Sequence, residues 1–349
     1  MNKKNSVLDE DNVMPHTDNL SYEVRSCADL YRMYKSNQLE IQPDFQRNFV
    51  WKPITQTIFV DSLCKGLPIP SIFISLDSST GRRIVIDGLQ RISTIVKFFE
   101  NSKWRLNKSS DIDENISGKS VAVIKQKFPN LYQRVENATI PVITIRSDFT
   151  MQGSMDGLFN IFHRLNTGGQ KLNNQEIRNC IYSGKFNDML KKIAKSEQWV
   201  NIMGTTNHID RLEDEEILLR TFVFLDRLDD YTGNLSKFLN HYMLDKKDIT
   251  DVELEDKRDI LTSTLYFLYE NIDNRETVSQ MGKTVKEALL VGVSKNIVSI
   301  SAKTKEEFRI IFERFLNDDC FKDENLKQGL SKKDKVQSRL KQSISIFSV

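Results

Sequence analysis

The sequence predicts an α+β protein, with a small sheet in its first half and an all-α second half. The first observation is a hairpin pattern: residues alternate in polarity over 71–76, a turn containing Gly81 follows, and apolar residues return over 83–86. The second is another strand-like segment over 138–145. The third is that strand patterns fade beyond about residue 185, where apolar residues recur at helical spacing instead.

The segments before the hairpin alternate between polar and patterned stretches. Residues 1–20 are polar and aperiodic, which favours a flexible N-terminal arm. Residues 28–34 are typical of a short helix, and 39–41 of an extended segment. A longer helix is expected over 55–64, because apolar residues recur there at helical spacing and a glycine and two prolines follow to end it.

Helices dominate after the hairpin. Residues 92–100 and 155–165 carry apolar side chains at helical spacing, whereas 101–137 is polar and mixed. Further helices are expected from about 173 and over 213–228, 256–272, 285–293, 306–316 and 332–346. We therefore expect an arm over 1–20, a motif-bearing domain over 21–185 and a helical domain over 186–349.

Composition excludes several classes of protein. The chain has 349 residues, of which 39% are hydrophobic and 20 are Phe, so a wholly disordered chain is excluded. Fifty Lys and Arg against 48 Asp and Glu give a net charge of +2, which excludes a histone-like polycation. The start is polar and no apolar run approaches a membrane span of about 20 residues. We expect a cytoplasmic protein without a membrane partner.

Cysteine and histidine spacing gives no metal site. The cysteines are Cys27, Cys64, Cys180 and Cys320, which are too far apart for a zinc ribbon or a disulfide framework. The four histidines are equally scattered, so no pair at metal-binding spacing exists. We predict reduced thiols and no metal ligands from these residues.

The most informative stretch, residues 84–95, is called the second motif. An apolar strand ends at Asp87, Gly88 permits a tight turn, and a helix begins almost at once. Helix N-termini present free N–H groups and a positive dipole end, which favour a phosphate. Arg91 and the hydroxyls of Ser93 and Thr94 would add ligands to that anion. The structural alternative is that Asp87 caps the helix and Arg91 pairs with a carboxylate.

Two further polar clusters flank this stretch. In the first motif, residues 42–51, Gln46 and Arg47 could converge with Arg91, or an aromatic loop could simply seal the core. The third motif, residues 162–179, contains a Gly pair that could do no more than end a helix. It also carries small and charged residues that would let a ligand approach, namely Asn166, Thr167, Gly168, Glu176 and Arg178.

Two segments of the second half invite a functional interpretation. Gly282-Lys283-Thr284 looks like the end of a Walker A loop, but Thr277 stands where the first glycine belongs and no strand precedes it. We interpret residues 284–287 as a helix capping box. The basic residues of 332–341 could contact a phosphate backbone, although a solvated helix face is the favoured interpretation.

Together and in this order, the three motifs resemble the N-terminal domain of GmrSD-type modification-dependent restriction enzymes. The family's segments PxFQRxxVW, (I/V)DGxQR(L/I)(T/S)T(I/L) and NxGxxLxxxE correspond here to 43–51, 87–95 and 166–176. The resemblance covers about residues 20–230, since 211–220 also looks like the family's helical continuation. It implies a ParB/sulfiredoxin-like N-terminal domain followed by an all-α domain.

The resemblance implies nucleotide chemistry. The DGQQR segment of related proteins is associated with NTP binding and hydrolysis, which makes a nucleoside triphosphate, with Mg²⁺, the implied cofactor. Carried over, Asp87, Gln90 and Arg91 become catalytic candidates, and Gly88 holds the triphosphate with Gln46 and Arg47 alongside. Leu89 departs from the family, because leucine can neither position water nor attack phosphorus. Hydrolysis is therefore less strongly implied than binding.

The nuclease of GmrSD-type enzymes has no counterpart in this sequence. Their cleavage module needs a catalytic histidine, and the only histidine after residue 210 is His241, without such a motif. The resemblance thus implies a DNA-associated NTP-binding protein of prokaryotic anti-phage defence, with a separate nuclease subunit as partner and a homo-oligomer as an open alternative. Two other hypotheses remain: a metal-dependent endonuclease using Asp44, Asp87 and Glu176, or a noncatalytic module whose helical half docks a partner.

Overall fold

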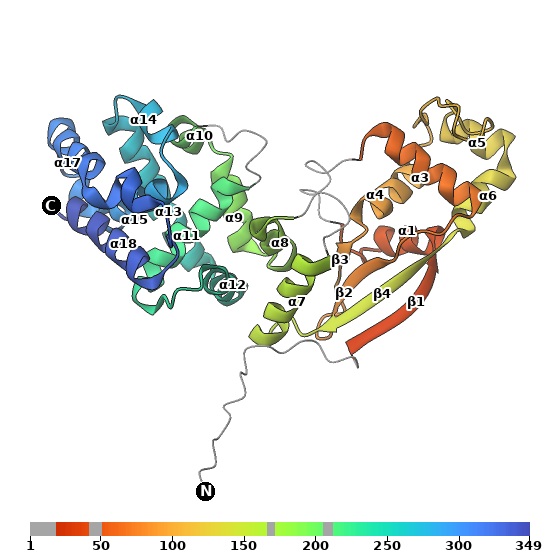
Figure 1. Cartoon of the computed structure of the whole chain (residues 1–349), viewed down its shortest axis with the longest axis horizontal. Helices are drawn as coiled ribbons and strands as arrows, with labels where there is room; N and C mark the ends of the chain where they lie inside the picture. Colours follow the sequence, from red (N-terminus) through yellow and green to blue (C-terminus); the bar gives the residue numbers. More distant parts are fainter. Residues whose placement is uncertain (1–18, 42–50, 166–171, 205–211) are drawn as a thin grey trace, which may run out of the picture. The chain divides into compact units, whose positions relative to one another are not determined.

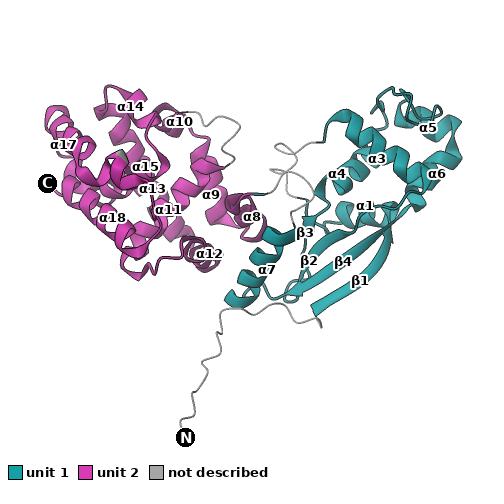
Figure 2. Ribbon diagram, in the orientation of Figure 1, with its two compact units in different colours: residues 1–172 teal, residues 173–349 magenta. Residues whose placement is uncertain are grey.

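Strands and helices alternate in the first half of the chain, and the second half is helical (Figure 1). The fold comes from a computed structural model that describes residues 19–41, 51–165, 172–204 and 212–349. The chain divides into unit 1, residues 1–172, and unit 2, residues 173–349 (Figure 2). The combination of one sheet with many helices confirms the predicted α+β class.

Unit 1 contains the sheet. Its strands are β1 (Leu20–Ser26), β2 (Ile72–Asp77), β3 (Arg83–Asp87) and β4 (Thr139–Ser147). Its helices are α1 (Cys27–Lys35), α3 (Pro53–Lys65), α4 (Leu89–Glu100), α5 (Val121–Lys127), α6 (Pro129–Asn137) and α7 (Gln152–Leu165). The predicted hairpin and the predicted strand over 138–145 are therefore confirmed.

The sheet has the strand order β1-β4-β2-β3. β4 pairs antiparallel with β1 and parallel with β2, and β2 pairs antiparallel with β3. The hairpin turn is fixed by Asp77, whose carboxylate accepts hydrogen bonds from Ser79, Thr80 and the Phe149 N–H. These bonds also tie the turn to the end of β4, so β3 leaves the turn in a fixed position.

The core of unit 1 fixes α4 against the sheet. Buried side chains from α1, α3, α4, β2 and β4 form one apolar cluster, to which α4 contributes Ile92, Ile95, Val96 and Phe98. Figure 1 shows α1, α3 and α4 on the same side of the sheet. Because these α4 residues recur at helical spacing, the face that the sequence predicts as apolar is the one that is buried. The N-terminus of α4 is consequently held at the end of β3.

The sequence analysis missed β1 for a physical reason. Tyr22 and Val24, its largest apolar residues apart from Leu20, are 73% and 66% exposed. An isolated strand with its apolar side chains outward lacks the pattern of a half-buried strand. Its place in the sheet comes from backbone pairing with β4.

Unit 2 is built from helices in its described residues. The α-helices are α8 (Asn174–Ile181), α9 (Lys185–Ala194), α10 (Glu197–Met203), α11 (Glu213–Arg227), α12 (Leu235–Asp245), α13 (Asp251–Asn271), α14 (Arg275–Ser279), α15 (Lys283–Lys295), α16 (Ile297–Ile300), α17 (Lys305–Asn317) and α18 (Lys333–Phe347). Short 3₁₀ helices cover Leu228–Asp230, Asp319–Phe321 and Asp323–Leu326.

Helix α15 lies at the centre of unit 2. Every residue from Lys286 to Ser294 is buried, and α11, α13 and α18 pack around the helix. Gly292 allows the close approach of α18, because a Cβ there would lie 2.3 Å from the Ser343 Oγ and 2.7 Å from a Phe347 ring carbon. Burial on all sides explains why residues 288–293 of this helix are apolar around its whole circumference.

One expectation for the second half was wrong, and another holds for the lysines of the last helix but not for its buried arginine. Residues 284–287 form no capping box, since α15 begins after Gly282, no side chain caps it, and Glu287 instead binds Arg220 and Arg339. The basic segment 332–341 is not simply a solvated face: Arg339 is buried, although the lysines before it are exposed. None of the described helices combines the length and apolar composition that crossing a bilayer requires.

Candidate functional site

The turn between β3 and α4 brings the residues of the second motif together. β3 ends at Asp87, Gly88 has φ +94°, and α4 starts at Leu89. No side chain caps this helix, so the first N–H groups of α4 lack a side-chain acceptor. A 12-residue helix with such an end can accept an anion there.

Gly88 is required at this turn for two reasons. Its φ lies in the left-handed region, which residues with a Cβ adopt at a cost. A Cβ would also lie 2.7 Å from the Cγ1 of the fully buried Ile72 and 3.2 Å from the Arg91 Nη2. The missing side chain therefore permits the strand, the turn and the helix to lie this close together.

Arg91 is engaged within the turn. Its Nη2 donates to Asp87 Oδ2 at 2.7 Å, and its Nη1 donates to the Ser71 carbonyl at 3.1 Å and to the Pro70 carbonyl. The arginine side chain is 11% exposed, so these bonds are largely shielded from water. The pairing with a carboxylate is the structural alternative that the sequence also allowed. Arg91 thus holds Asp87 and joins the turn to the start of β2.

Gln90 connects the second motif with the end of the first. Its Oε1 accepts a hydrogen bond from the Trp51 N–H at 2.9 Å. The Trp51 carbonyl accepts one from Gln56, whose own oxygen accepts from Lys97 at 2.7 Å. Burial lowers the pKa of Lys97. These bonds fix the position of Trp51 just before α3 begins. No side-chain pattern in the sequence indicates these bonds.

The two hydroxyls of the motif differ in their surroundings. Thr94 donates its Oγ1 hydrogen to the Gln90 carbonyl at 2.7 Å, within its own helix. The Ser93 Oγ is buried and has no hydrogen-bond partner among the described residues. A buried hydroxyl without a partner is unfavourable unless a ligand or water supplies one. Ser93 is accordingly the hydroxyl that an added ligand would stabilise.

The other predicted site residues belong to the first and third motifs. Gln46 and Arg47 of the first motif lie outside the described residues, as do Asn166, Thr167 and Gly168 of the third. Glu176 and Arg178 belong to α8 in unit 2.

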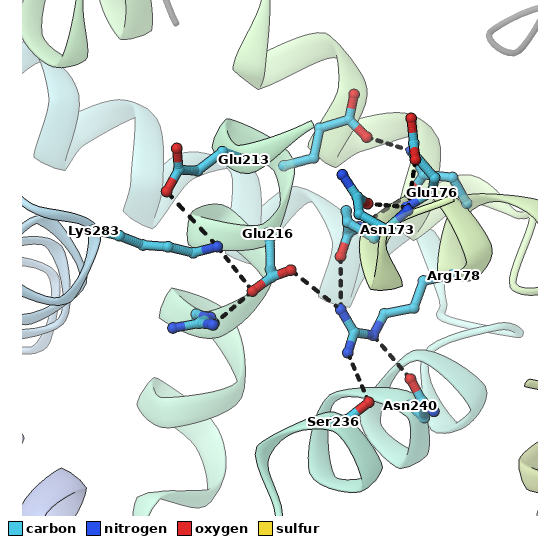
Figure 3. A network of polar contacts seen from close by, with 12 residues as sticks. Asn173, Glu176, Arg178, Glu213, Glu216, Ser236, Asn240 and Lys283 are labelled. Carbon is cyan, nitrogen blue, oxygen red and sulfur yellow. Dashed lines mark hydrogen bonds and ion pairs between the residues drawn. The ribbon is translucent and has the colours of Figure 1, made fainter. Parts of the chain in front are cut away.

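Helix α8 uses Glu176 and Arg178 for its own structure. Asn173 and Glu176 form a reciprocal capping box, with bonds of 2.8 and 2.7 Å (Figure 3). The Arg178 side chain is 1% exposed and donates to Asn240 at 2.8 Å and to Ser236 at 3.4 Å. Burial lowers the pKa of Arg178 to about 10, which leaves it charged at neutral pH. Its contacts join α8 to α12.

The described residues offer no preformed metal site. Nowhere in 19–41, 51–165, 172–204 and 212–349 do three or more His, Cys, Asp or Glu side chains gather closely enough to hold a metal ion. Cys27, Cys64 and Cys180 are buried and form no disulfide bond among the described residues, and burial raises the pKa of Cys27 and Cys64 to about 12. The thiols agree with the prediction of reduced cysteines.

Residues 27–183 match the family described as the GmrSD restriction endonuclease N-terminal domain. The match covers less than half of the chain, and over these residues the chain is similar to that domain. The match contains all three motifs and the complete β3–α4 turn. No curated protein and no solved structure matches the chain, so the ParB/sulfiredoxin likeness stays a prediction.

The end of the family match differs from the end of unit 1. The family match extends to residue 183, close to the expected domain boundary at 185, whereas unit 1 ends at residue 172. Helix α8 accounts for the difference, because it lies within the family match but packs with α11 and α12. The match links residues 27–183 to restriction systems.

Proposed function

We propose that unit 1 binds a nucleoside triphosphate with Mg²⁺ at the β3–α4 turn. The observation that carries the proposal is the uncapped N-terminus of α4 directly after Gly88. Free N–H groups there can bind phosphate oxygens, and the absence of a Cβ lets a phosphate approach the backbone. The family match supports this assignment, because the DGLQR segment lies inside it.

Asp87 and Ser93 fit this ligand. Arg91 binds the Oδ2 of Asp87, while the Oδ1 has no hydrogen bond among the described residues. A carboxylate beside a phosphate would repel it unless a cation lies between them, and Mg²⁺ commonly binds one or two carboxylates together with phosphate oxygens. The Ser93 hydroxyl would gain the partner that it lacks. Arg91 and Gln90 serve as positioning residues, since their side chains already hold the turn and Trp51.

We assign nucleotide binding to this turn. Hydrolysis of the nucleotide would need a group from elsewhere in the protein to activate water. Leu89 supplies no group that could activate water. We further propose that the nucleotide state of the domain controls a separate nuclease subunit on DNA. The support for this part is the match to a family described as the N-terminal domain of the GmrSD restriction endonuclease.

The test measures binding of labelled ATP, GTP and CTP to the full chain, with and without Mg²⁺ and DNA. Ser93→Ala should keep the stability of the wild type, because the hydroxyl makes no bond, but should weaken binding of the preferred nucleotide about tenfold. Asp87→Asn should remove the dependence of binding on Mg²⁺. Arg91→Ala is a poorer probe, because it also releases the turn.

Ser62→Ala is the matched control. Ser62 also lies in a helix of unit 1, but its hydroxyl bonds the Ile58 carbonyl on the outside of α3, so nucleotide affinity should stay at the wild-type value. The proposal fails if the wild type binds none of the three nucleotides. It fails equally if Ser93→Ala and Asp87→Asn both bind as the wild type does.

A further inference from the structure

Unit 2 contains a cavity of about 820 Å³ among α8, α11, α12, α15 and α18. This volume lies within the usual range of small-molecule sites, roughly 300–1,000 Å³. One part of the wall is apolar and includes Phe224, Leu239 and Phe321, and the other part is charged. A cavity with both kinds of wall suits a ligand that has an apolar body and a charged group.

The charged wall has more cations than anions. Among the described residues that line the cavity, four are cationic and two are anionic, namely Arg178, Arg220, Lys283 and Arg339 against Glu216 and Glu287. Glu213 lies outside the lining and contacts Lys283 at 3.8 Å. The positive excess favours an anionic ligand.

Each of the four cations contacts Glu216, Glu287 or both. Glu216 contacts Arg220 at 2.6 Å, Lys283 at 2.9 Å and Arg178 at 3.6 Å, and Figure 3 shows its carboxylate between Lys283 and Arg178. Burial by itself raises the pKa of Glu216, but the charges of these three cations outweigh it and lower that pKa to about 2. Glu216 is therefore ionised at neutral pH.

The second carboxylate has longer contacts and leaves buried donors without partners. Glu287 contacts Arg339 at 3.3 Å and Arg220 at 3.4 Å. The Nε atoms of both arginines are buried and have no hydrogen-bond partner in the part of unit 2 that the structure describes. The Arg339 side chain, which lines the cavity, is only 7% exposed. Buried cationic donors without acceptors are unfavourable unless an anion completes them.

The N-terminus of α15 points to the type of anion. Gly282, Lys283 and Thr284 line the same cavity, and the 13-residue helix that they begin has no side-chain cap. Its free N–H groups and positive dipole end add to the charge of Lys283. The segment resembles the end of a Walker A loop, but α14 rather than a strand precedes it. Phosphate binding here would thus rest on the helix end and the surrounding arginines.

We propose that this cavity is a second anion site that binds a phosphorylated small molecule with two or more negative charges. Its phosphate group lies at the N-terminus of α15, between Lys283, Arg220 and Arg339, and its apolar body lies against the wall that contains Phe224 and Phe321. The site is separate from the β3–α4 turn and does not depend on the function proposed for that turn.

The test measures calorimetric binding of pyrophosphate, ATP and adenosine to the full chain. We expect pyrophosphate and ATP to bind and adenosine not to bind, because the phosphates make the charged contacts. Lys283→Gln should weaken pyrophosphate binding at least tenfold. The matched control is Lys295→Gln, since Lys295 is an exposed lysine at the opposite end of the same helix and should leave pyrophosphate affinity unchanged.

Two further measurements distinguish this site from the β3–α4 turn and from a folding defect. Ser93→Ala should not alter pyrophosphate binding at α15, so failure at the β3–α4 turn can be told from failure here. In the wild type, pyrophosphate should protect Lys283 but not Lys295 from acylation, which gives a readout even if Lys283→Gln does not fold. The proposal is overturned if the wild type does not bind pyrophosphate, if both lysine variants lose affinity equally, or if Lys283 is not protected.

Discussion

A glycine in the left-handed region can be required by backbone strain alone or by strain together with lack of space. Gly81 and Gly88 separate the two causes, because both have positive φ, at +72° and +94°. A Cβ on Gly81 would meet nothing within 4 Å, whereas one on Gly88 would lie 2.7 Å from buried Ile72. We expect Gly81→Ala to cost about 1–2 kcal/mol from strain, and Gly88→Ala a further 1–3 kcal/mol from overpacking.

Urea denaturation of the two variants and the wild type measures this difference. The midpoint of unit 1 unfolding should fall further for Gly88→Ala than for Gly81→Ala. Equal losses would mean that Ile72 can move aside, and the closeness of β2 and α4 would then contribute nothing to the requirement for glycine.

Glu216 makes the stability of unit 2 depend on pH. Its pKa is lowered to about 2 in the folded protein because Arg220, Lys283 and Arg178 outweigh burial. A lowered pKa stabilises the fold fully above the ordinary value of 4.5, and this contribution is lost as the pH falls towards 2. We expect Glu216→Gln to cost about 2–3 kcal/mol at pH 6, and less than about 1 kcal/mol near pH 2.5.

Urea titrations at pH 6, 4 and 2.5, followed by circular dichroism, measure the free energy of unfolding. Glu213→Gln is the control, because Glu213 lies one turn earlier and contacts Lys283 at 3.8 Å rather than 2.9 Å. A difference between wild type and Glu216→Gln that stays constant over this pH range would contradict the assigned ion pairs.

The arginines of the motifs show what residue type can and cannot predict. From sequence, Arg91 is a catalytic candidate and Arg178 a candidate for binding the nucleotide. In the structure Arg91 binds Asp87 and two carbonyls, and Arg178 is buried against Asn240. A carbonyl has no sequence signature, and Asn240 lies 62 positions away. The charge was predictable, whereas the partner depends on the fold.

Strands and helices could be predicted from the sequence where their apolar residues face the core. The hairpin and α4 were predicted because their apolar residues face the core of unit 1. β1 was missed because Tyr22 and Val24 face outward. The last helix was predicted almost to its ends, yet the burial of Arg339 was not, because its partner Glu287 comes from α15 and lies 52 positions earlier.

The charged cavity of unit 2 could not be predicted for a related reason. Its cations come from α8, α11, α15 and α18, so no local pattern joins them. Gly282-Lys283-Thr284 was the one local signal, and by itself it pointed to the wrong phosphate-binding loop. The capping box expected there was wrong because Glu287 is turned towards two arginines instead of the start of its helix.

For the whole molecule, separate cores predict separate unfolding. Unit 1 buries its side chains between helices and a sheet, and unit 2 buries them around α15. We therefore expect two thermal transitions in calorimetry. Gly88→Ala should lower one of them, and Gly292→Ala should lower the other, because a Cβ at 292 would push α18 away at Ser343 and Phe347.

Each loss of about 1–3 kcal/mol should lower its transition by several degrees. Gly153→Ala is the control for substitution in a helix: a Cβ there meets nothing within 4 Å, so the unit 1 transition should stay or rise slightly as alanine favours the helix. A single transition that both Gly88→Ala and Gly292→Ala lower equally would show that the two cores unfold as one. A ligand that stabilises either core would then raise that same transition.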